Sequence, residues 1–256
     1  MPTPSFESEI ARAADAISAA KSVAVLTGAG ISAESGVPTF RASDGLWEGH
    51  RIEEVATPRG YRKNPQLVWQ FYNARRANVG TVKPNPGHDA LVKLEQRLGS
   101  KFTLVTQNVD GLHRAAGSQN LLEIHGSLYR TRCTPCGDIR DRGLEPLGDD
   151  PLCPDCEGKL RPDIVWFEEM LPPGIWERAV TAAEECDLFL VVGTSAVVYP
   201  AAGLIPIAKD QAKSFPAVVI ECNLTQTNAS DLADIGLYGP AGVLLPQVLA
   251  RLQGNV

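Results

Sequence analysis

The chain has 256 residues, of which 44% are hydrophobic and 21% are charged. This length supports one large domain with a substantial core, or one core with a small appended module. The formal net charge of −6 argues against broad, charge-driven binding to nucleic acids or membranes. No apolar run is long enough to span a membrane, and the N-terminus lacks the pattern of a signal or transit peptide. We therefore expect a cytoplasmic location, with the mitochondrial matrix and the nucleus as alternatives.

One stretch departs from this acidic balance. Residues 51–76 contain six Lys or Arg and two Glu, so the net charge of this stretch is six minus two, or +4. Such a stretch is either a solvated basic face or part of a site for an anion.

Helices and strands alternate through most of the chain. Apolar residues at helical spacing predict an opening helix over 9–20, and the run at 23–26 predicts a buried strand that ends in a glycine turn. A helix is expected over 64–78, with Asn64 as its N-cap and Pro65 in its first position. Another is expected over 88–98, after the proline-rich break that precedes it.

Later segments continue the alternation. Strands are expected at 102–106, 121–124, 188–192 and 217–221, and a helix over 244–252 closes the chain. Strands that alternate with helices imply an α/β fold: a Rossmann-type parallel sheet with helices on both faces. Residues 126–161 interrupt the pattern, because they have few apolar runs and are rich in Pro, Gly, charge and cysteine. We interpret them as an inserted module.

Four cysteines in this module form two pairs with metal-ligand spacing. Cys133 and Cys136 make one Cys-x-x-Cys pair, and Cys153 and Cys156 make the other. Two such pairs can complete a tetrahedron around one zinc ion, and four sulfur ligands leave no open position for catalysis. We therefore expect one structural zinc ion; the alternatives are a redox pair or four buried thiols. Cys186 and Cys222 are expected to be ordinary buried cysteines, before and directly after a strand.

Gly28 and Gly30 directly follow the first predicted strand. Glycines at such a turn let backbone N–H groups approach a pyrophosphate closely. Ala33 stands where the usual dinucleotide fingerprint has its third glycine or alanine. This turn alone does not separate hydride transfer from another use of a dinucleotide.

Seven segments, in order, resemble motifs of the sirtuin family. They are GAGISAESGVPTFRASDGLW at 28–47, TQNVDGLH at 106–113, EIHGS at 123–127, the paired cysteines, IVWFEE at 164–169, GTSAVVYPAAGL at 193–204 and IECN at 220–223. The chain departs from the family pattern at Glu168, where a glycine is usual.

The resemblance implies an NAD-binding Rossmann-type domain made of residues 1–40, 88–127 and 162–256. It also implies a smaller domain formed by insertions, with a helical part at 41–87 and a zinc-binding module at 128–161. NAD and an acyl-lysine would meet between the two. In the implied reaction the acyl oxygen attacks the ribose carbon that bears nicotinamide, nicotinamide leaves, and O-acyl-ADP-ribose and free lysine result.

The resemblance assigns His125 as the general base on the ribose hydroxyls, and an imidazole titrates in the range where such a base works. It implies that Val165, Trp166 and Phe167 bind the substrate as an extended peptide, by strand addition. Asn108 and Asp110 suit the nicotinamide amide, although both residue types also favour turns. The residues implied to bind NAD are Gly28, Ala29, Gly30, Ile31, Phe40, Arg41, Trp47, Gln107, Asn108, Asp110, Gly193, Thr194, Ser195, Asn223, Leu224, Thr225 and Ala241.

Tyr72 and Arg75 are three residues apart on a predicted helix and so share one face. An arginine can hold a carboxylate with two parallel bonds, and a tyrosine hydroxyl can add a third. The pair resembles the acidic-acyl pocket of class III, desuccinylase-type sirtuins, and Ala56 resembles their small residue that leaves room for a longer acyl chain. The alternative is a surface arginine and a half-buried tyrosine of an ordinary amphipathic helix.

The resemblance therefore predicts a deacylase for succinyl- and malonyl-lysine, with some activity on acetyl-lysine. The alternatives are a plain deacetylase, an ADP-ribosyltransferase and a non-enzymatic module that binds NAD and zinc. The expected partners are acyl-lysine proteins, without membrane or specific nucleic-acid binding, and the chain is expected to be a monomer.

Overall fold

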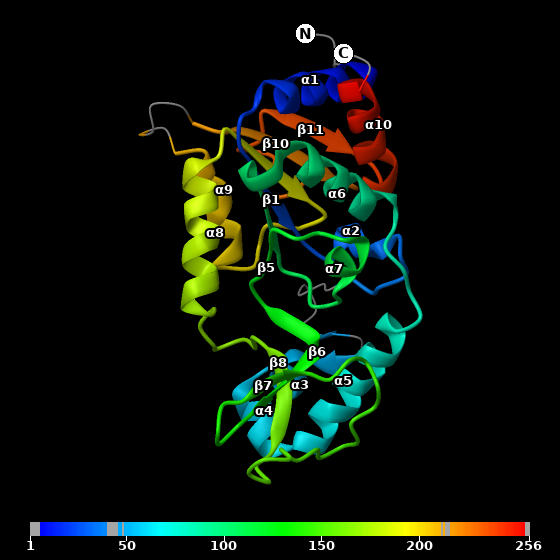
Figure 1. Ribbon diagram of the computed structural model, residues 1–256, viewed down its shortest axis with the longest axis vertical. Helices are drawn as coiled ribbons and strands as arrows, with labels where there is room; N and C mark the ends of the chain where they lie inside the picture. The colour runs from blue at the N-terminus through cyan, green and yellow to red at the C-terminus, as the bar shows by residue number, and fades with distance from the viewer. Residues whose placement is uncertain (1–5, 40–45, 48, 211, 213–215, 254–256) are drawn as a thin grey trace.

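The computed structural model has a large lobe and a smaller lobe, at the top and bottom of Figure 1. It describes residues 6–39, 46–47, 49–210, 212 and 216–253. Both chain ends lie at the far end of the large lobe, away from the small one (Figure 1). Within the described residues, no helix combines the length and the apolar character that crossing a membrane requires.

Six described strands form one parallel sheet in the order β11-β10-β9-β1-β4-β5. They are β1 (Val23–Thr27), β4 (Phe102–Thr106), β5 (Leu121–Glu123), β9 (Leu188–Val192), β10 (Val218–Asn223) and β11 (Ile235–Tyr238). The chain adds β4 and β5 on one side of β1 and then β9, β10 and β11 on the other. The carboxyl ends of β1 and β9 therefore flank the point where the winding reverses, which is where doubly wound sheets bind their ligands.

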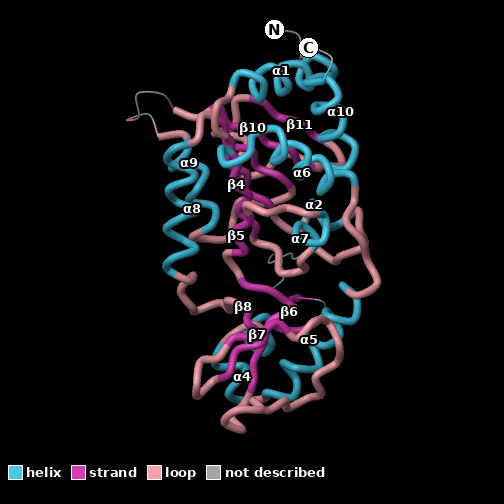
Figure 2. The backbone as a smooth tube through the Cα atoms, viewed as in Figure 1, coloured by secondary structure: helices cyan, strands magenta, loops and turns pink. Residues whose placement is uncertain are grey.

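Helices cover both faces of this sheet (Figure 2). One face carries α1 (Phe6–Ala19), α6 (Pro86–Leu98) and α10 (Ala241–Gln253), and the other carries α8 (Pro173–Glu185) and α9 (Leu204–Ala208). Successive strand residues point to opposite faces, so Val23 and Val25 of β1 pack in the first core while Ala24 and Leu26 pack in the second. A strand that is apolar on both faces is what a sheet covered on both sides requires.

Short helical segments complete the large lobe. They are α2 (Gly30–Ala33), α7 (Leu112–Ala116) and the 3₁₀ turns Gly99–Lys101 and Ala201–Gly203.

The small lobe combines two distant stretches of the chain. One supplies β2 (Leu46–Trp47), β3 (His50–Arg51), α3 (Ile52–Val55), α4 (Pro58–Lys63) and α5 (Pro65–Val79), and the other supplies the antiparallel strands β6 (Gly126–Cys133), β7 (Ile139–Asp141) and β8 (Leu160–Ile164). Tyr61 Oη and Trp69 Nε1 both donate to the carbonyl of Leu160, at 2.8 and 2.9 Å. These bonds and a shared apolar core join the helices to the strands.

The expected fold class is confirmed: a Rossmann-type sheet accompanies a small antiparallel sheet that carries the four cysteines. β4 and β9 have the predicted bounds, and Asn64 caps α5 by accepting from the N–H of Leu67 at 3.1 Å. Some placements were wrong in detail. The opening helix spans Phe6–Ala19, α6 begins at Pro86 instead of residue 88, α10 begins at Ala241 instead of residue 244, and Cys222 lies within β10, not after it.

The two lobes meet at Gly126, which directly follows His125. Val165 N donates to the carbonyl of His125 at 2.9 Å, which fastens the chain beyond β8 to the end of β5. Gly126 has φ of +86°, and a Cβ there would lie 2.0 Å from the carbonyl oxygen of Asp163. The junction therefore requires glycine for both space and backbone conformation.

We expect Gly126→Ala to lower the free energy of unfolding by about 2–4 kcal/mol, because overpacking and a left-handed alanine both cost energy. The matched control is Gly148→Ala, where φ is +76° but no atom lies within 4 Å of the added Cβ. Denaturant unfolding of both variants measures the difference. Equal losses would show that the close approach at Gly126 contributes nothing.

Candidate active site and metal centre

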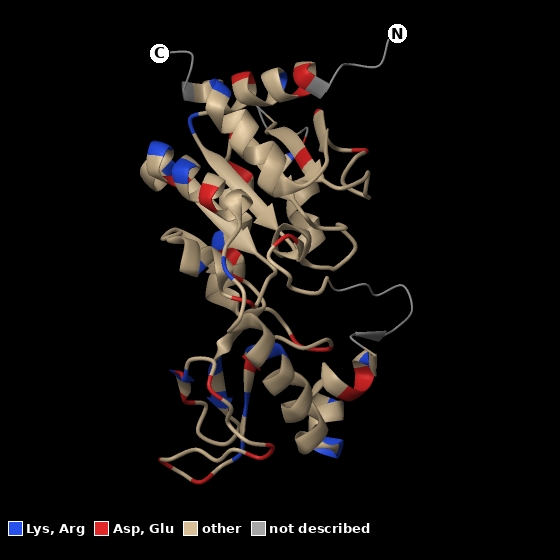
Figure 3. Ribbon diagram, turned by 90° about the vertical axis from the view of Figure 1, so that its right-hand side faces the viewer, with Lys and Arg blue, Asp and Glu red and all other residues tan. Residues whose placement is uncertain are grey.

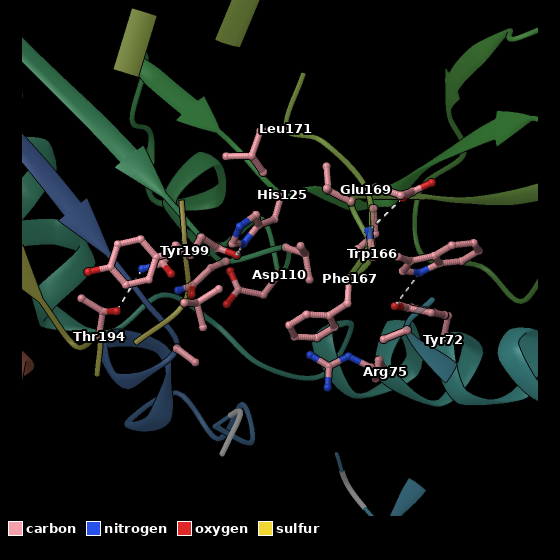
Figure 4. A pocket seen from close by; sticks show the side chains of 18 of the residues that line it. Tyr72, Arg75, Asp110, His125, Trp166, Phe167, Glu169, Leu171, Thr194 and Tyr199 are labelled. Atoms are coloured by element: carbon pink, nitrogen blue, oxygen red, sulfur yellow. Dashed lines mark hydrogen bonds between the residues drawn. The ribbon is translucent and has the colours of Figure 1, made fainter. Parts of the chain in front are cut away.

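A cavity lies between the carboxyl edge of the large sheet and the small lobe, and Figure 4 shows 18 of the side chains that line it. The loops after β1, β4, β5 and β9 supply one wall, and α5 with residues 164–169 supplies the other. The predicted site residues that line it are Ala29, Ala56, Tyr72, Arg75, Gln107, Asn108, Asp110, His125, Val165, Trp166, Phe167, Thr194 and Ser195.

Gly28, Gly30 and Gly193 bring the ends of β1 and β9 into backbone contact. Gly30 N donates to the carbonyl of Gly193 at 2.7 Å, and Gly28 N donates to that of Val192 at 3.0 Å. A Cβ on Gly30 would lie 2.7 Å from Gly193 Cα. These glycines therefore close the turn at the switch point.

Polar side chains converge at the ends of β4 and β9. Gln107 Nε2 donates to Thr194 Oγ1 at 3.0 Å, which links the two strand ends across β1. Asn108 Nδ2 donates to the carbonyl of Gly28 at 3.1 Å and to Ser32 Oγ at 3.2 Å. Asp110 accepts from the N–H of Leu112 at 2.9 Å, and burial raises the pKa of its carboxyl group. This set of amide, hydroxyl and carboxyl groups has the chemistry to bind the polar parts of a dinucleotide.

His125 has one ring nitrogen committed to the protein. Its Nδ1 lies 3.1 Å from the carbonyl oxygen of Gln107. A carbonyl can only accept, so Nδ1 carries the proton and the neutral ring keeps its lone pair on Nε2. Burial lowers the pKa of His125, and the bond to Gln107 opposes that shift only partly. At neutral pH the residue is therefore an uncharged imidazole with a basic Nε2.

Tyr72 and Arg75 occupy the buried end of the cavity, on α5. Trp166 Nε1 donates to Tyr72 Oη at 2.9 Å, so the tyrosine hydroxyl proton is left to point elsewhere. Burial raises the pKa of Tyr72 to about 12, which keeps the hydroxyl protonated. Arg75 is largely buried and lies over the ring of Phe71, with 5.6 Å from its guanidinium carbon to the ring centroid. Figure 4 shows its guanidinium group beside Phe167.

The segment that follows β8 is fastened to both lobes. Phe167 N donates to the carbonyl of Ala56 at 3.0 Å, in addition to the bond from Val165 N. Glu169 accepts from both terminal nitrogens of Arg161, at 2.6 and 2.8 Å, and from Trp166 N at 2.9 Å. Arg161 in turn lies 3.5 Å from the centroid of the Trp166 ring. Glu169 therefore holds this segment in place.

Four further predicted NAD-binding residues that the structure describes lie in or beyond the large core, outside the cavity lining, and Asn223 lies at the end of β10. Ile31 and Ala241 are buried in the first core, whereas Leu224 and Thr225 are exposed beyond β10. Asn223 Nδ2 donates to the carbonyl of Thr194 at 2.8 Å, which joins the ends of β10 and β9. Phe40 and Arg41 lie outside the described residues, and so does the side chain of Trp47 in β2.

Several residues that line the cavity were not predicted: Val37, Pro38, Val109, Ile164, Glu168, Glu169, Leu171, Val198, Tyr199 and Pro200. Most are apolar, so their chemistry alone does not mark them in the sequence. All except Leu171 nevertheless lie within the motif segments 28–47, 106–113, 164–169 and 193–204, so the resemblance was the available signal.

The +4 stretch at 51–76 separates into two groups. Arg75 and Arg76 are buried, and Arg76 donates to the carbonyls of Leu128 and Glu145. Arg51 and Arg59 are exposed and lie 3.5 and 3.6 Å from Glu53 and Glu168. The stretch is therefore not one continuous basic face; Figure 3 shows acidic and basic residues interspersed in the small lobe.

Two histidines lie buried behind the cavity. The rings of His88 and His113 are 4.8 Å apart, and His113 Nε2 lies 2.9 Å from Thr27 Oγ1. Burial lowers the pKa of His88 to about 4 and that of His113 well below its usual value. Both rings are therefore neutral, and His88 Nδ1 accepts from Asn85 N at 3.3 Å in the N-terminal cap of α6. Of the four histidines, His125 is the one found in the cavity lining.

The four predicted metal ligands come together in the small lobe. The sulfur atoms of Cys133, Cys136, Cys153 and Cys156 all lie within 4.8 Å of one another, and the pairs Cys133–Cys156 and Cys136–Cys153 are 3.4 and 4.0 Å apart. Zinc–sulfur bonds of about 2.3 Å in a tetrahedron place sulfur atoms about 3.8 Å apart. The residues present therefore fit a structural zinc ion.

Fold and site together define a dinucleotide-binding protein with a structural zinc lobe. The profile described as Sir2 family matches residues 28–200. The chain is 46% identical over 242 residues to NAD-dependent protein deacylase 2 of Pyrobaculum aerophilum, covering 94% of each protein. It is 49% identical over 245 residues to an NAD-dependent protein deacylase of Thermus thermophilus, covering 93% of this chain and 94% of that protein. The chain belongs to the Sir2 family.

Solved structures agree with this assignment. A Sir2 homologue in complex with NAD superposes with a TM-score of 0.87 at 41% identity, covering 95% of this chain and 94% of that one. A Sir2 variant with a deacetylated p53 peptide and 3′-O-acetyl-ADP-ribose has a TM-score of 0.83 at 30% identity, over 93% and 96% of the two chains. A third relative, bound to a myristoylated histone peptide, has a TM-score of 0.78 at 34% identity, over 98% and 100%.

We expect one zinc ion per chain, and we expect Cys153→Ser to lose it. Cys153 and Cys133 pack in the core that also holds Tyr72 and Trp166, so loss of the ion should unfold much of the small lobe. Elemental analysis and thermal unfolding measure both effects. The matched control is Cys186→Ala in the large lobe, which should keep the metal; an unchanged melting temperature in metal-free Cys153→Ser would contradict the structural role.

Proposed function

We propose that this protein is an NAD-dependent deacylase that removes acyl groups from lysine side chains of other proteins. The observation that carries the proposal is a single cavity that holds an uncharged His125, the polar strand ends of the Rossmann-type sheet and a buried pocket in the small lobe. The names of the relatives and the NAD, acetyl-ADP-ribose and peptide complexes of the solved structures support it.

The strand ends offer the groups that would hold NAD. Ala29 on the glycine turn, Gln107, Asn108 and Thr194 would contact it, and Asp110 would receive the carboxamide of its nicotinamide. When bound, NAD supplies the ribose carbon that exchanges nicotinamide for the acyl oxygen. Asn108 is held rigidly by its two bonds to Gly28 and Ser32, so it binds its ligand without further ordering.

His125 would act as the general base. Its Nδ1–H bond to the carbonyl of Gln107 sets the ring orientation, and its Nε2 would take the proton of a ribose hydroxyl. The resulting imidazolium would keep its Gln107 bond, which favours the charged form. One carbonyl therefore orients the base before proton transfer and stabilises it afterwards.

We further propose that acidic acyl groups, succinyl and malonyl, are the better substrates and that acetyl-lysine is also accepted. Tyr72, with its oxygen already accepting from Trp166, would donate its hydroxyl proton to the acyl carboxylate, and Arg75 would pair with that carboxylate from the same helix. Ala56 adds little volume to the wall, which leaves room for a four-carbon chain.

Purified, zinc-loaded protein mixed with NAD and acyl-lysine peptides tests the activity. Release of nicotinamide with free lysine and O-acyl-ADP-ribose, identified by mass, supports deacylation. ADP-ribose attached to protein would instead show a transferase, equal rates on succinyl and acetyl peptides would show no acidic-acyl preference, and intact NAD with every peptide would leave only a binding module. The cytoplasmic location and the monomeric state stay predictions.

We expect the acidic limb of kcat/KM for an acetyl-lysine peptide to have its midpoint below 6.5, the ordinary histidine value. The base is active when neutral, and burial disfavours its charged form, so activity should persist to lower pH than for an exposed imidazole. The acetyl peptide is chosen because its acyl group does not titrate. A midpoint above 6.5 would contradict this environment for His125.

We expect Arg75→Met to reduce desuccinylation by about 10- to 150-fold, the equivalent of about 1.5–3 kcal/mol for a lost charge-assisted contact. Deacetylation should change little, because an acetyl group has no carboxylate. Steady-state kinetics on matched peptides measures both. Arg62→Met, an exposed arginine on α4, is the control for loss of charge alone; equal loss of both activities in Arg75→Met would contradict the pocket.

A further inference from the structure

Glu168 has an unusual backbone conformation at the cavity. Three described residues other than glycine have a positive φ: Glu157 at +57°, Glu168 at +73° and Ala196 at +55°. A left-handed conformation costs an L-residue free energy and is typically retained where the side chain or the local geometry has a use. Glu157 lies in the turn of a cysteine pair, where Glu157 N donates to the carbonyl of Cys153 at 2.9 Å. Glu168, by contrast, lines the cavity with its side chain at the mouth.

Glu168 lies at the open end of that cavity. Its side chain is 54% exposed, whereas Tyr72 and Arg75 at the other end are buried. Tyr199, which also lines the cavity, is exposed as well. An acyl-lysine whose acyl group reaches Arg75 must leave its own main chain and its neighbouring residues at this open end, beside the carboxylate of Glu168.

The carboxylate of Glu168 is weakly engaged. Its neighbour Glu169 is neutralised by two bonds from Arg161, at 2.6 and 2.8 Å. Among the described residues, Glu168 has one ion-pair partner, Arg59, at 3.6 Å, and that arginine is 66% exposed. Ion pairs between exposed side chains contribute little and exchange easily. A cationic side chain of a substrate can therefore replace Arg59.

We propose that Glu168 is a specificity residue that favours protein substrates with a Lys or Arg flanking the acyl-lysine. The inference rests on the proposed deacylase function and adds the class of sequence that the same site selects. Arg59 limits the preference, because it competes with the substrate cation for the same carboxylate. In this proposal Tyr72 and Arg75 at the buried end select the acyl group, whereas Glu168 at the open end selects the residue that flanks the acyl-lysine.

The test measures kcat/KM on acetyl-lysine peptides in which one residue at a time is changed to Arg, Gln or Glu. The varied residues are the two before and the two after the acetyl-lysine, and the flank ratio is kcat/KM for the Arg peptide divided by kcat/KM for the Glu peptide. Wild-type protein should prefer Arg over Glu at one or more positions, and Glu168→Gln should reduce that ratio by about 2- to 5-fold, the range of an exposed ion pair. Arg59→Gln should raise the ratio, because it frees the carboxylate. Both effects should shrink at high salt. Glu184→Gln on the exposed side of α8 is the control for net charge and should leave the ratio unchanged.

A second pair of variants separates charge from backbone strain. Glu168→Gly and Glu157→Gly both remove a left-handed L-residue, so both should raise the melting temperature, but only Glu168→Gly should reduce the flank preference. A flank ratio that is the same in wild type, Glu168→Gln and Arg59→Gln, with normal turnover of the Gln-flanked peptide, overturns this inference alone. Absence of turnover on every peptide in wild-type protein overturns the proposed function itself.

Discussion

The site depends on the backbone junction between His125 and Val165. The N–H of Val165 bonds to the carbonyl of His125, and the next residue, Gly126, packs against the backbone of Asp163 with no room for a side chain. This contact lies two residues after β5, the edge strand of the large sheet, and at the first residue of β6 in the small lobe. It therefore places the imidazole on one side of the cavity and the segment 165–169 on the other. A displacement here would separate the base from the pocket that receives the substrate.

Burial then sets the protonation state of each group around that junction. It holds His125 neutral with a basic Nε2, keeps Tyr72 as a hydroxyl donor and raises the pKa of Asp110. The two carboxylates near the mouth of the cavity differ in how tightly they are paired. Glu169 is held by Arg161, whereas Glu168 is only loosely paired with Arg59. Interior groups thus have fixed roles in chemistry and acyl recognition, and the loosely held charge is left at the surface where substrates differ.

Much of the fold could be predicted from local patterns. β1, β4 and β9 are apolar on both faces, and Asn64–Pro65 is a helix start that needs no tertiary context. The strands β6 and β8 could not be found in the same way. They carry Arg130, Arg132 and Asp163, and the carboxylate of Asp163 pairs with both arginines across the sheet at 3.0 and 2.9 Å. These charged residues interrupt the apolar pattern by which a strand is recognised in a sequence. α8 was missed too, although it begins with proline at its first position, as helices often do.

The sequence by itself determined the chemistry that is local in the chain: the glycine turn after β1, the two cysteine pairs, the Tyr72–Arg75 spacing and the motif around His125. Only the tertiary structure decided which nitrogen of His125 is the base, since that depends on the carbonyl of Gln107. It also decided that Glu169 is bound by Arg161, whereas Glu168 is only loosely paired with Arg59. In the structure Ile31 and Ala241, which were predicted to bind NAD, are buried in a core, and Val198 and Tyr199 line the cavity. The reason is physical: residue type and spacing set what a side chain can do, whereas burial and partners from distant segments set what it does.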